Sequence, residues 1–209
     1  MPTRKRTILI VEDEPNLSTQ YRLLCTLALR EVSQQLGELA VPAPRSAADE
    51  PLAQNSEILT AFSYAEASAT LQAIPELDFV SVDLVLQNQE ASVPNHSPTT
   101  DVEAKGMTIL KELREKHKRT IVVVASGENR LSYAMDALQR YKVIHYFRKP
   151  IDGEAYKNTI KAALWYLEAA DHIDKVQRYE EDVDNLEIAE QCWHRAIESA
   201  AGGQATTVQ

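Results

Sequence analysis

The sequence has few cysteines and no long apolar run. Its two cysteines, Cys25 and Cys192, lie far apart, and neither belongs to a spacing such as C-x-x-C that binds a metal. A disulfide framework is therefore not indicated. No apolar run approaches the roughly 20 residues that a membrane-spanning helix needs. The basic start also lacks the apolar core of a signal peptide. We therefore expect a cytoplasmic protein without a membrane partner.

The sequence also lacks an excess of positive charge. Lys and Arg number 22 against 31 Asp and Glu, which gives a net charge of -9. An acidic chain repels nucleic acid and anionic lipid, so we expect no nucleic-acid partner. The one local basic cluster, Arg4-Lys5-Arg6, is interpreted as a solvated leader. The hydrophobic content of 44% is that of a globular protein.

Short apolar runs alternate with helical patterns along the first 168 residues. The runs predict strands at 7–11, 57–63, 78–86, 121–125 and 143–147, and apolar spacings of three and four predict helices at 17–36, 65–74, 106–119, 131–141 and from Glu154. This alternation predicts an α/β fold, with a parallel sheet covered by helices on both faces. Residues 37–56 and 87–105 contain prolines and no periodicity, and are predicted to be long loops.

Polar side chains follow four of the predicted strands. Glu12 and Asp13 follow the first, Asp83 lies near the end of the third, and Ser126 and Lys149 end the fourth and fifth. Taken singly, Asp83 can simply cap a turn, and acids favour a helix N-terminus. Because the carboxyl ends of parallel strands meet at one edge, the coincidence favours a shared site.

These residues suit phosphoryl chemistry. Three carboxylates form a hard-oxygen site that fits Mg²⁺, which relieves their mutual repulsion. Asp83 can then attack phosphorus and form an acyl phosphate. Lys149 can pair with one phosphoryl oxygen and the hydroxyl of Ser126 can donate to another.

The pattern resembles the response-regulator receiver (CheY-like) domains of two-component signalling. The matching motifs are Ile8-Leu9-Ile10-Val11-Glu12-Asp13-Glu14-Pro15, Val82-Asp83-Leu84, Val124-Ala125-Ser126-Gly127-Glu128 and Tyr146-Phe147-Arg148-Lys149-Pro150. The resemblance implies a flavodoxin-like five-stranded sheet of order 2-1-3-4-5.

The resemblance also implies a role for each site residue. Asp83 would accept the phosphoryl group, and Glu12, Asp13, Asp83 and the backbone carbonyl of Val85 would hold Mg²⁺. Ser126 and Tyr146 would be the switch pair, and Lys149 would pair with the phosphate. The Lys149–Pro150 bond would be cis.

The sequence departs from the family in three respects. Gln87 stands where the family often has proline, and the segments 37–56 and 87–105 are longer than usual. None of these changes removes a site residue, but they bear on kinase docking and on the lifetime of the phosphoryl group. Tyr146 also fits a second interpretation, as a half-buried aromatic of the strand.

An acidic helical extension, residues 169–201, is expected to follow a receiver domain at 1–168 and to precede a flexible tail at 202–209. The segment from Glu168 to Glu198 contains ten acidic residues and only three basic ones, Lys175, Arg178 and Arg195. This balance excludes a conventional helix-turn-helix DNA reader. Apolar spacings predict an amphipathic helix that forms a homodimer, binds a partner or packs on its own receiver domain. One long helix and a hairpin both fit, because 182–185 are weak helix formers.

The sequence therefore predicts a phosphoacceptor protein that signals through protein contacts and has no DNA-binding output. Its partners would be a histidine kinase or phosphotransfer protein and a downstream protein. It would be no enzyme beyond its own phosphoryl transfer and hydrolysis. The alternative is a constitutive scaffold or dimerisation protein on the same fold. An acyl-phosphate phosphatase is disfavoured, because Val85 stands where that class needs a second aspartate.

Overall fold

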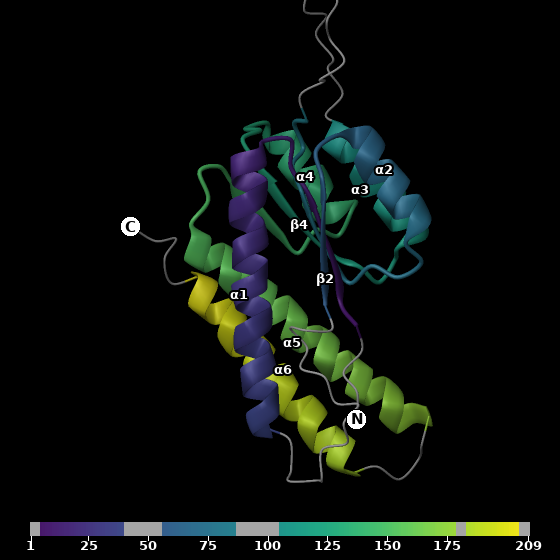
Figure 1. Ribbon diagram of the computed structural model, residues 1–209, viewed down its shortest axis with the longest axis vertical. Helices are drawn as coiled ribbons and strands as arrows, with labels where there is room; N and C mark the ends of the chain where they lie inside the picture. The colour runs from purple at the N-terminus through teal and green to yellow at the C-terminus, as the bar shows by residue number, and fades with distance from the viewer. Residues whose placement is uncertain (1–4, 40–55, 87–104, 179–182, 205–209) are drawn as a thin grey trace, which may run out of the picture. The chain divides into compact units, whose positions relative to one another are not determined.

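The computed structural model describes residues 5–39, 56–86, 105–178 and 183–204 (Figure 1). The described residues form two compact units. Those within Thr7–Arg22 and Ile58–Ile151 make up one unit, and those within Met1–Arg6, Leu23–Glu57 and Asp152–Gln209 make up the other. Most of the expected loops 37–56 and 87–105, together with Gln87, lie outside the described residues.

A five-stranded parallel sheet contains β1 (Thr7–Val11), β2 (Glu57–Ala61), β3 (Phe79–Val82), β4 (Ile121–Ser126) and β5 (His145–Arg148). Its order is β2-β1-β3-β4-β5, the flavodoxin-like order that the sequence predicts. The register sets Val11 beside Val82, Val82 beside Val124, and Ser126 beside Arg148. The last residues of these strands therefore lie along one edge.

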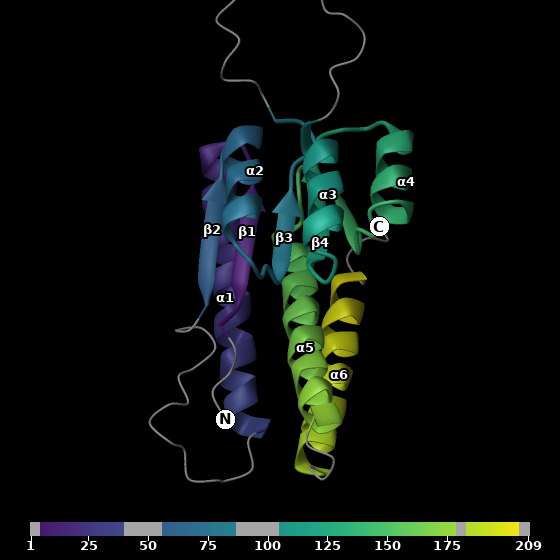
Figure 2. The ribbon, with the colours of Figure 1, turned by 90° about the vertical axis from the view of Figure 1, so that its right-hand side faces the viewer.

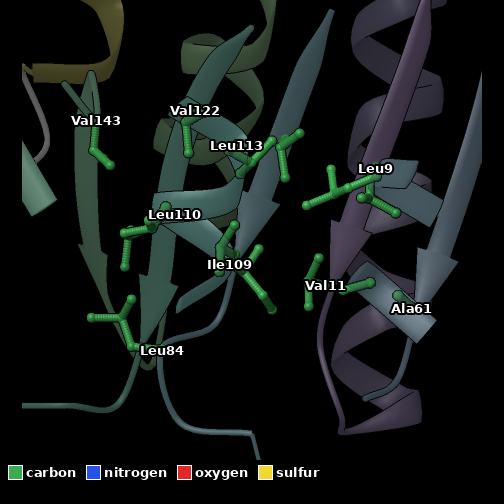
Figure 3. Packing of buried hydrophobic residues seen from close by; sticks show 14 of the residues in the cluster. Leu9, Val11, Ala61, Leu84, Ile109, Leu110, Leu113, Val122 and Val143 are labelled. Atoms are coloured by element: carbon green, nitrogen blue, oxygen red, sulfur yellow. The ribbon is translucent and has the colours of Figure 1, made fainter. Parts of the chain in front are cut away.

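Three helices pack on one face of this sheet: α2 (Tyr64–Ala73), α3 (Lys105–Lys116) and α4 (Leu131–Gln139). They share a buried hydrophobic cluster with the strands, and Figure 3 shows several of its members. The residues that point the other way, such as Ile8, Ile10, Phe79 and Val123, are fully buried as well. The central strands β1, β3 and β4 are thus shielded from water on both faces, as expected for apolar strands of a parallel sheet, whereas the edge strands β2 and β5 are more exposed.

A helix α1 (Pro15–Leu39) follows β1 and begins at the proline that the sequence places at a first helical position. The C-terminal part of the chain forms α5 (Gly153–Arg178) and α6 (Val183–Gln204). These two helices pack against each other as a hairpin, so the hairpin alternative is observed and the single long helix is not (Figure 2). No helix among the described segments is both long and apolar enough to cross a membrane.

The side of α6 that meets α5 differs from the one that large apolar residues would suggest. The buried residues of α6 are small: Ala189, Cys192 and Ala196. Their spacing of three and four places them on one side of the helix, and small side chains let two helix backbones approach closely. The larger Trp193 and Ile197 remain exposed instead.

Arg6 corrects the interpretation of the basic start as a solvated leader. Its side chain is fully buried. The guanidinium donates to Glu168 Oε1 over 2.7 Å and 3.1 Å, and its second ion pair, with Asp171 Oδ2, spans 2.8 Å. A buried charge needs such partners, and both lie one turn apart on α5. Hydropathy alone could not predict this, because the acids that pair with Arg6 are far away in the sequence.

Candidate functional site

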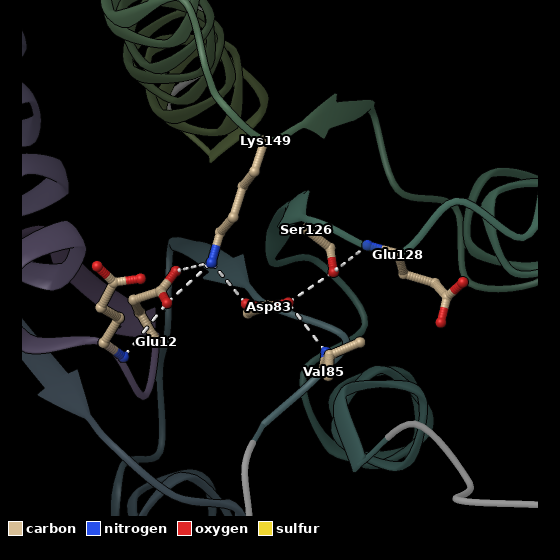
Figure 4. Close-up of polar contacts among 7 residues, drawn as sticks. Glu12, Asp83, Val85, Ser126, Glu128 and Lys149 are labelled. Carbon is tan, nitrogen blue, oxygen red and sulfur yellow. Dashed lines mark hydrogen bonds and ion pairs between the residues drawn. The ribbon is translucent and has the colours of Figure 1, made fainter.

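The predicted site residues come together at the carboxyl edge of the sheet (Figure 4). Glu12 and Asp13 follow β1, Asp83 follows β3, Ser126 ends β4 and Lys149 follows β5. All of them belong to one compact unit. The backbone continues the register beyond the strands, since Asp83 N donates to Val11 O and Lys149 N donates to Ser126 O.

Asp83 lies at the centre of a hydrogen-bond network and is only 4% exposed. Its Oδ1 accepts from Ser126 Oγ over 2.6 Å and from the backbone N–H of Val85 over 2.9 Å. Its Oδ2 accepts from Lys149 Nζ over 2.6 Å. Figure 4 shows the carboxylate held between these three donors. Both oxygens of this buried carboxylate therefore have a hydrogen-bond donor.

Glu12 shares Lys149 with Asp83. The distances from Lys149 Nζ to Glu12 Oε1 and Oε2 are 2.9 Å and 2.7 Å. Burial is the main cause that raises the pKa of Glu12 to about 7; the negative charge of Asp83 contributes to the rise, and Lys149 acts against it. Burial by itself would lower the pKa of Lys149, but the bonds to Asp83 and Glu12 raise it above the ordinary value. One cation therefore serves two buried carboxyl groups.

Glu12, Asp13 and Asp83 could hold a metal ion. One carboxylate oxygen from each lies within 4.8 Å of the other two. An all-oxygen, carboxylate donor set suits Mg²⁺, and Lys149 alone does not balance three negative charges. The donor chemistry therefore fits the ion that the resemblance implies. Val85 lies beside this group, and its N–H bonds to Asp83.

A second series of contacts leads away from Asp83. Ser126 is fully buried, and its Oγ also accepts from the backbone N–H of Glu128 over 3.3 Å. The carbonyl of Glu128 accepts from the hydroxyl of Tyr146 over 2.9 Å. Tyr146 is half-buried against the hydrophobic cluster, and this burial raises its pKa. The predicted switch pair is thus connected through one residue, Glu128, that the sequence did not single out.

The segment from Glu128 also reaches α4. The carboxylate of Glu128 pairs with Arg130 over 2.7 Å, and this lowers the pKa of Glu128. The guanidinium of Arg130 lies 4.0 Å from the centre of the Tyr133 ring, within the range of a cation–π contact. These contacts connect Ser126 with the first turn of α4.

Gly106 is a site residue that sequence reasoning noted only as the start of a helix. A Cβ at this position would overlap the carbonyl oxygen of Asp83 and the Cα of Leu84, and would lie 2.9 Å from the carbonyl carbon of Asp83. Gly106 N also donates to Leu84 O over 3.1 Å. The first turn of α3 therefore packs directly on the backbone that carries Asp83. A glycine at the beginning of the helix after this strand was the available signal.

The peptide bond between Lys149 and Pro150 is cis, as predicted.

The chain was compared with protein families, curated proteins and solved structures. No family model and no curated protein matches the sequence. Among solved structures, the chain is similar to the signal receiver domain of an HD domain-containing protein from Pseudomonas fluorescens Pf-5, at 19% identity over 77% of this chain and 95% of that one, with a TM-score of 0.45.

Two further matches are of the same kind. One is the signal receiver domain of a putative Luxo repressor protein from Vibrio parahaemolyticus, at 16% identity over 81% of this chain and 98% of that one, with a TM-score of 0.49. The other is a CheY-like receiver domain protein from Methanospirillum hungatei JF-1, at 12% identity over 90% of this chain and 98% of that one, with a TM-score of 0.43. All three of these structures are of receiver domains. The strand order of this chain, β2-β1-β3-β4-β5, is the flavodoxin-like one.

Proposed function

We propose that the protein is a phosphoacceptor response regulator in which Asp83 receives a phosphoryl group and thereby changes contacts with other proteins. The observation that carries the proposal is the environment of Asp83. A buried carboxylate at a strand end is held by Lys149, Ser126 and a backbone N–H, beside two further acids. Three donors around one carboxylate exceed what the cap of a turn requires.

The donors around Asp83 are suited to receive a phosphoryl group. A carboxylate oxygen of Asp83 attacks phosphorus, and the bond to the leaving group breaks with its electron pair going to that group. With a phosphohistidine donor, the leaving imidazole nitrogen then takes up a proton. Lys149 Nζ, Ser126 Oγ and the N–H of Val85 already lie within 2.9 Å of the carboxylate. They can shift to the new phosphoryl oxygens as charge-assisted donors.

Glu12, Asp13 and Asp83 would hold a Mg²⁺ ion, with the carbonyl of Val85 as a further ligand. When bound, the ion supplies charge neutralisation among the acids and polarises the phosphoryl group. Lys149 supplies a further positive charge beside the acids. Lys149 in particular keeps Glu12 and Asp83 together at distances of 2.6–2.9 Å.

Phosphorylation would be reported through Ser126. Moving its hydroxyl from Asp83 to a phosphoryl oxygen would loosen the contact with Glu128 N and thereby affect Tyr146 and Arg130. About 1.5 to 2 added negative charges make this rearrangement favourable.

The protein would act in the cytoplasm, and its output would be a contact with another protein. DNA binding is disfavoured because the chain carries a net charge of -9. The upstream partner would be a histidine kinase or a phosphotransfer protein. The protein would catalyse only its own phosphoryl transfer and hydrolysis.

The test is phosphorylation by a small phosphodonor, such as phosphoramidate, with and without Mg²⁺, followed by intact-mass measurement. We expect one phosphoryl group on the wild type in the presence of Mg²⁺, and none on Asp83→Asn. Asp78→Asn is the matched control, because Asp78 is equally buried and accepts from Thr7 N over 2.8 Å at the opposite end of the same strand. Persistent labelling of Asp83→Asn would contradict the proposal.

The alternative function, a constitutive scaffold, predicts a different result. Beryllofluoride, which mimics an acyl phosphate, would then leave the protein's contacts unchanged. We expect beryllofluoride to change the contacts of residues 126–133 in the wild type and not in Asp83→Asn. Hydrogen exchange at these residues measures the change.

A further inference from the structure

An exposed apolar strip runs along the outside of the α5–α6 hairpin. We call it the outer seam and define it by five residues whose exposed fractions are 46% for Tyr166, 42% for Ile173, 51% for Leu186, 47% for Trp193 and 53% for Ile197. Isolated exposed apolar residues are ordinary, but a contiguous group that includes two aromatic rings usually marks an interaction surface. All five belong to one compact unit.

Helical periodicity and one ring contact show that these residues share a side. Ile173 is seven residues after Tyr166, so the two lie on the same side of α5. Leu186 and Ile197 lie seven residues before and four residues after Trp193, which places the three on one side of α6. The two sides are adjacent, because the ring centres of Tyr166 and Trp193 are 5.7 Å apart. The antiparallel course of the hairpin then aligns Ile173 with the Leu186 end (Figure 2).

The outer seam is not the main contact between the two helices. The helix pair is already closed by the buried Ala189, Cys192 and Ala196 on α6, and by Trp165 and Ala169 on α5. Each of the five side chains keeps about half of its surface in water, and a further contact would gain free energy by burying it. This is the arrangement of a helix pair that accepts another helix.

The charges around the outer seam indicate what that helix is like. The exposed face of α6 carries Glu187, Glu190 and Glu198, of which Glu190 and Glu198 have side chains 75% and 68% exposed. Arg195 lies on the same helix, and its pair with Glu198 is long, at 3.6 Å. Among the described residues of α6, the rim of the seam therefore carries more acidic than basic side chains.

We propose that the outer seam docks an amphipathic helix of another protein, with an apolar stripe and a basic rim. A second copy of this chain would bring its own glutamates against Glu187 and Glu190, and like charges across an interface are unfavourable. A basic helix gains both apolar burial and charge complementarity. The proposal does not depend on phosphorylation of Asp83.

The experiment titrates the full chain with two synthetic helical peptides that share a Leu/Ile stripe and lack aromatic residues. One carries Lys at its rim positions and the other carries Glu. Tryptophan emission reports on the seam, because Trp165 is fully buried whereas Trp193 is exposed. We expect the Lys peptide to shift the emission to the blue and to bind at least about tenfold more tightly than the Glu peptide. Trp193→Phe should lose the shift.

Two variants test the apolar seam and its acidic rim, and a third is a control. Ile197→Lys should weaken the binding of the Lys peptide to the chain. Glu190→Lys should abolish the preference of the chain for the Lys peptide over the Glu peptide. Leu131→Lys on α4, where the leucine is 75% exposed, is the control that should change nothing. Each variant places a good helix former at an exposed helical position, and circular dichroism checks that the helix content is retained.

Equal affinities for the two peptides, or an unchanged affinity in Ile197→Lys, would overturn the proposal. Sedimentation equilibrium tests the competing occupant. A wild-type dimer that Ile197→Lys dissociates would assign the outer seam to a second copy and would likewise overturn it.

Discussion

The closest packing in the site, between Gly106 and the backbone of Asp83, gives a quantitative prediction for Gly106→Ala. The new Cβ would overlap two backbone atoms, the carbonyl oxygen of Asp83 and the Cα of Leu84. Backbone atoms cannot move aside as a flexible side chain can, so we place the cost near the upper end of the usual overpacking range, about 3 kcal/mol. Alanine gains at most roughly 1 kcal/mol in helix propensity over glycine, because that value applies to a helix interior and Gly106 is the second residue of α3. The net expectation is a loss of at least about 2 kcal/mol.

The same displacement should impair the site. A shift of about 1 Å in a reacting group can lower a rate by roughly 100-fold. We therefore expect Gly106→Ala to lose about 4–8 °C in thermal midpoint and to be labelled by phosphoramidate much more slowly. Differential scanning calorimetry and the initial rate of labelling measure the two effects.

Gly127→Ala is the matched control, since Gly127 follows Ser126 yet a Cβ there would have no atom within 4 Å. It should change the free energy of unfolding by no more than about 0.5 kcal/mol. If Gly106→Ala were as stable and as quickly labelled as Gly127→Ala, the packing argument would be refuted.

Three further predictions concern charge. Because burial raises the pKa of Glu12 from 4.5 to about 7, the folded state retains a proton that the unfolded chain releases, so the free energy of unfolding should fall as the pH rises across this window. Urea midpoints should show the slope in the wild type, and the same slope in Glu12→Gln would count against it. Mg²⁺ at 100 times its dissociation constant should raise the free energy of unfolding by about 2.7 kcal/mol and therefore raise the thermal midpoint. EDTA should reverse this gain, and Asp13→Asn should reduce it. Equal gains in the wild type and in Asp13→Asn would show that Asp13 is not a ligand. Arg6→Met should destabilise the protein by about 3–5 kcal/mol, because Glu168 keeps a buried charge without its partner. The double variant Arg6→Met/Glu168→Leu should regain most of the lost stability, as measured by urea denaturation. No recovery would show that Glu168 is not the main partner of Arg6.

The strands and the site were readable from the sequence for a simple reason. Each strand of a parallel sheet that is buried on both faces is a continuous apolar run, and the first polar residues after it necessarily lie at the carboxyl edge. Glu12 and Asp83 could therefore be placed together without any knowledge of distances. β5 is more exposed, and Lys149 was placed because it follows the last predicted strand. The sheet order β2-β1-β3-β4-β5 confirms the topology on which that inference depends.

Long-range pairing was not readable in the same way. Nothing in the sequence near Arg6 shows that its partner is Glu168, 162 residues further along the chain. The basic cluster that contains Arg6 was therefore interpreted as a solvated leader. Gly106 likewise reveals its role only when α3 is docked on Asp83. In both cases the deciding neighbour comes from a distant segment.

By itself, the sequence determined the fold class, the strand ends that form the site and the amphipathic character of the C-terminal helices. Only the tertiary structure decided that the extension is a hairpin and which side of α6 it buries. Apolar spacing marks Trp193 and Ile197 as readily as Ala189 and Ala196. Helix packing selects the small residues, because they allow close approach, and leaves the large ones exposed.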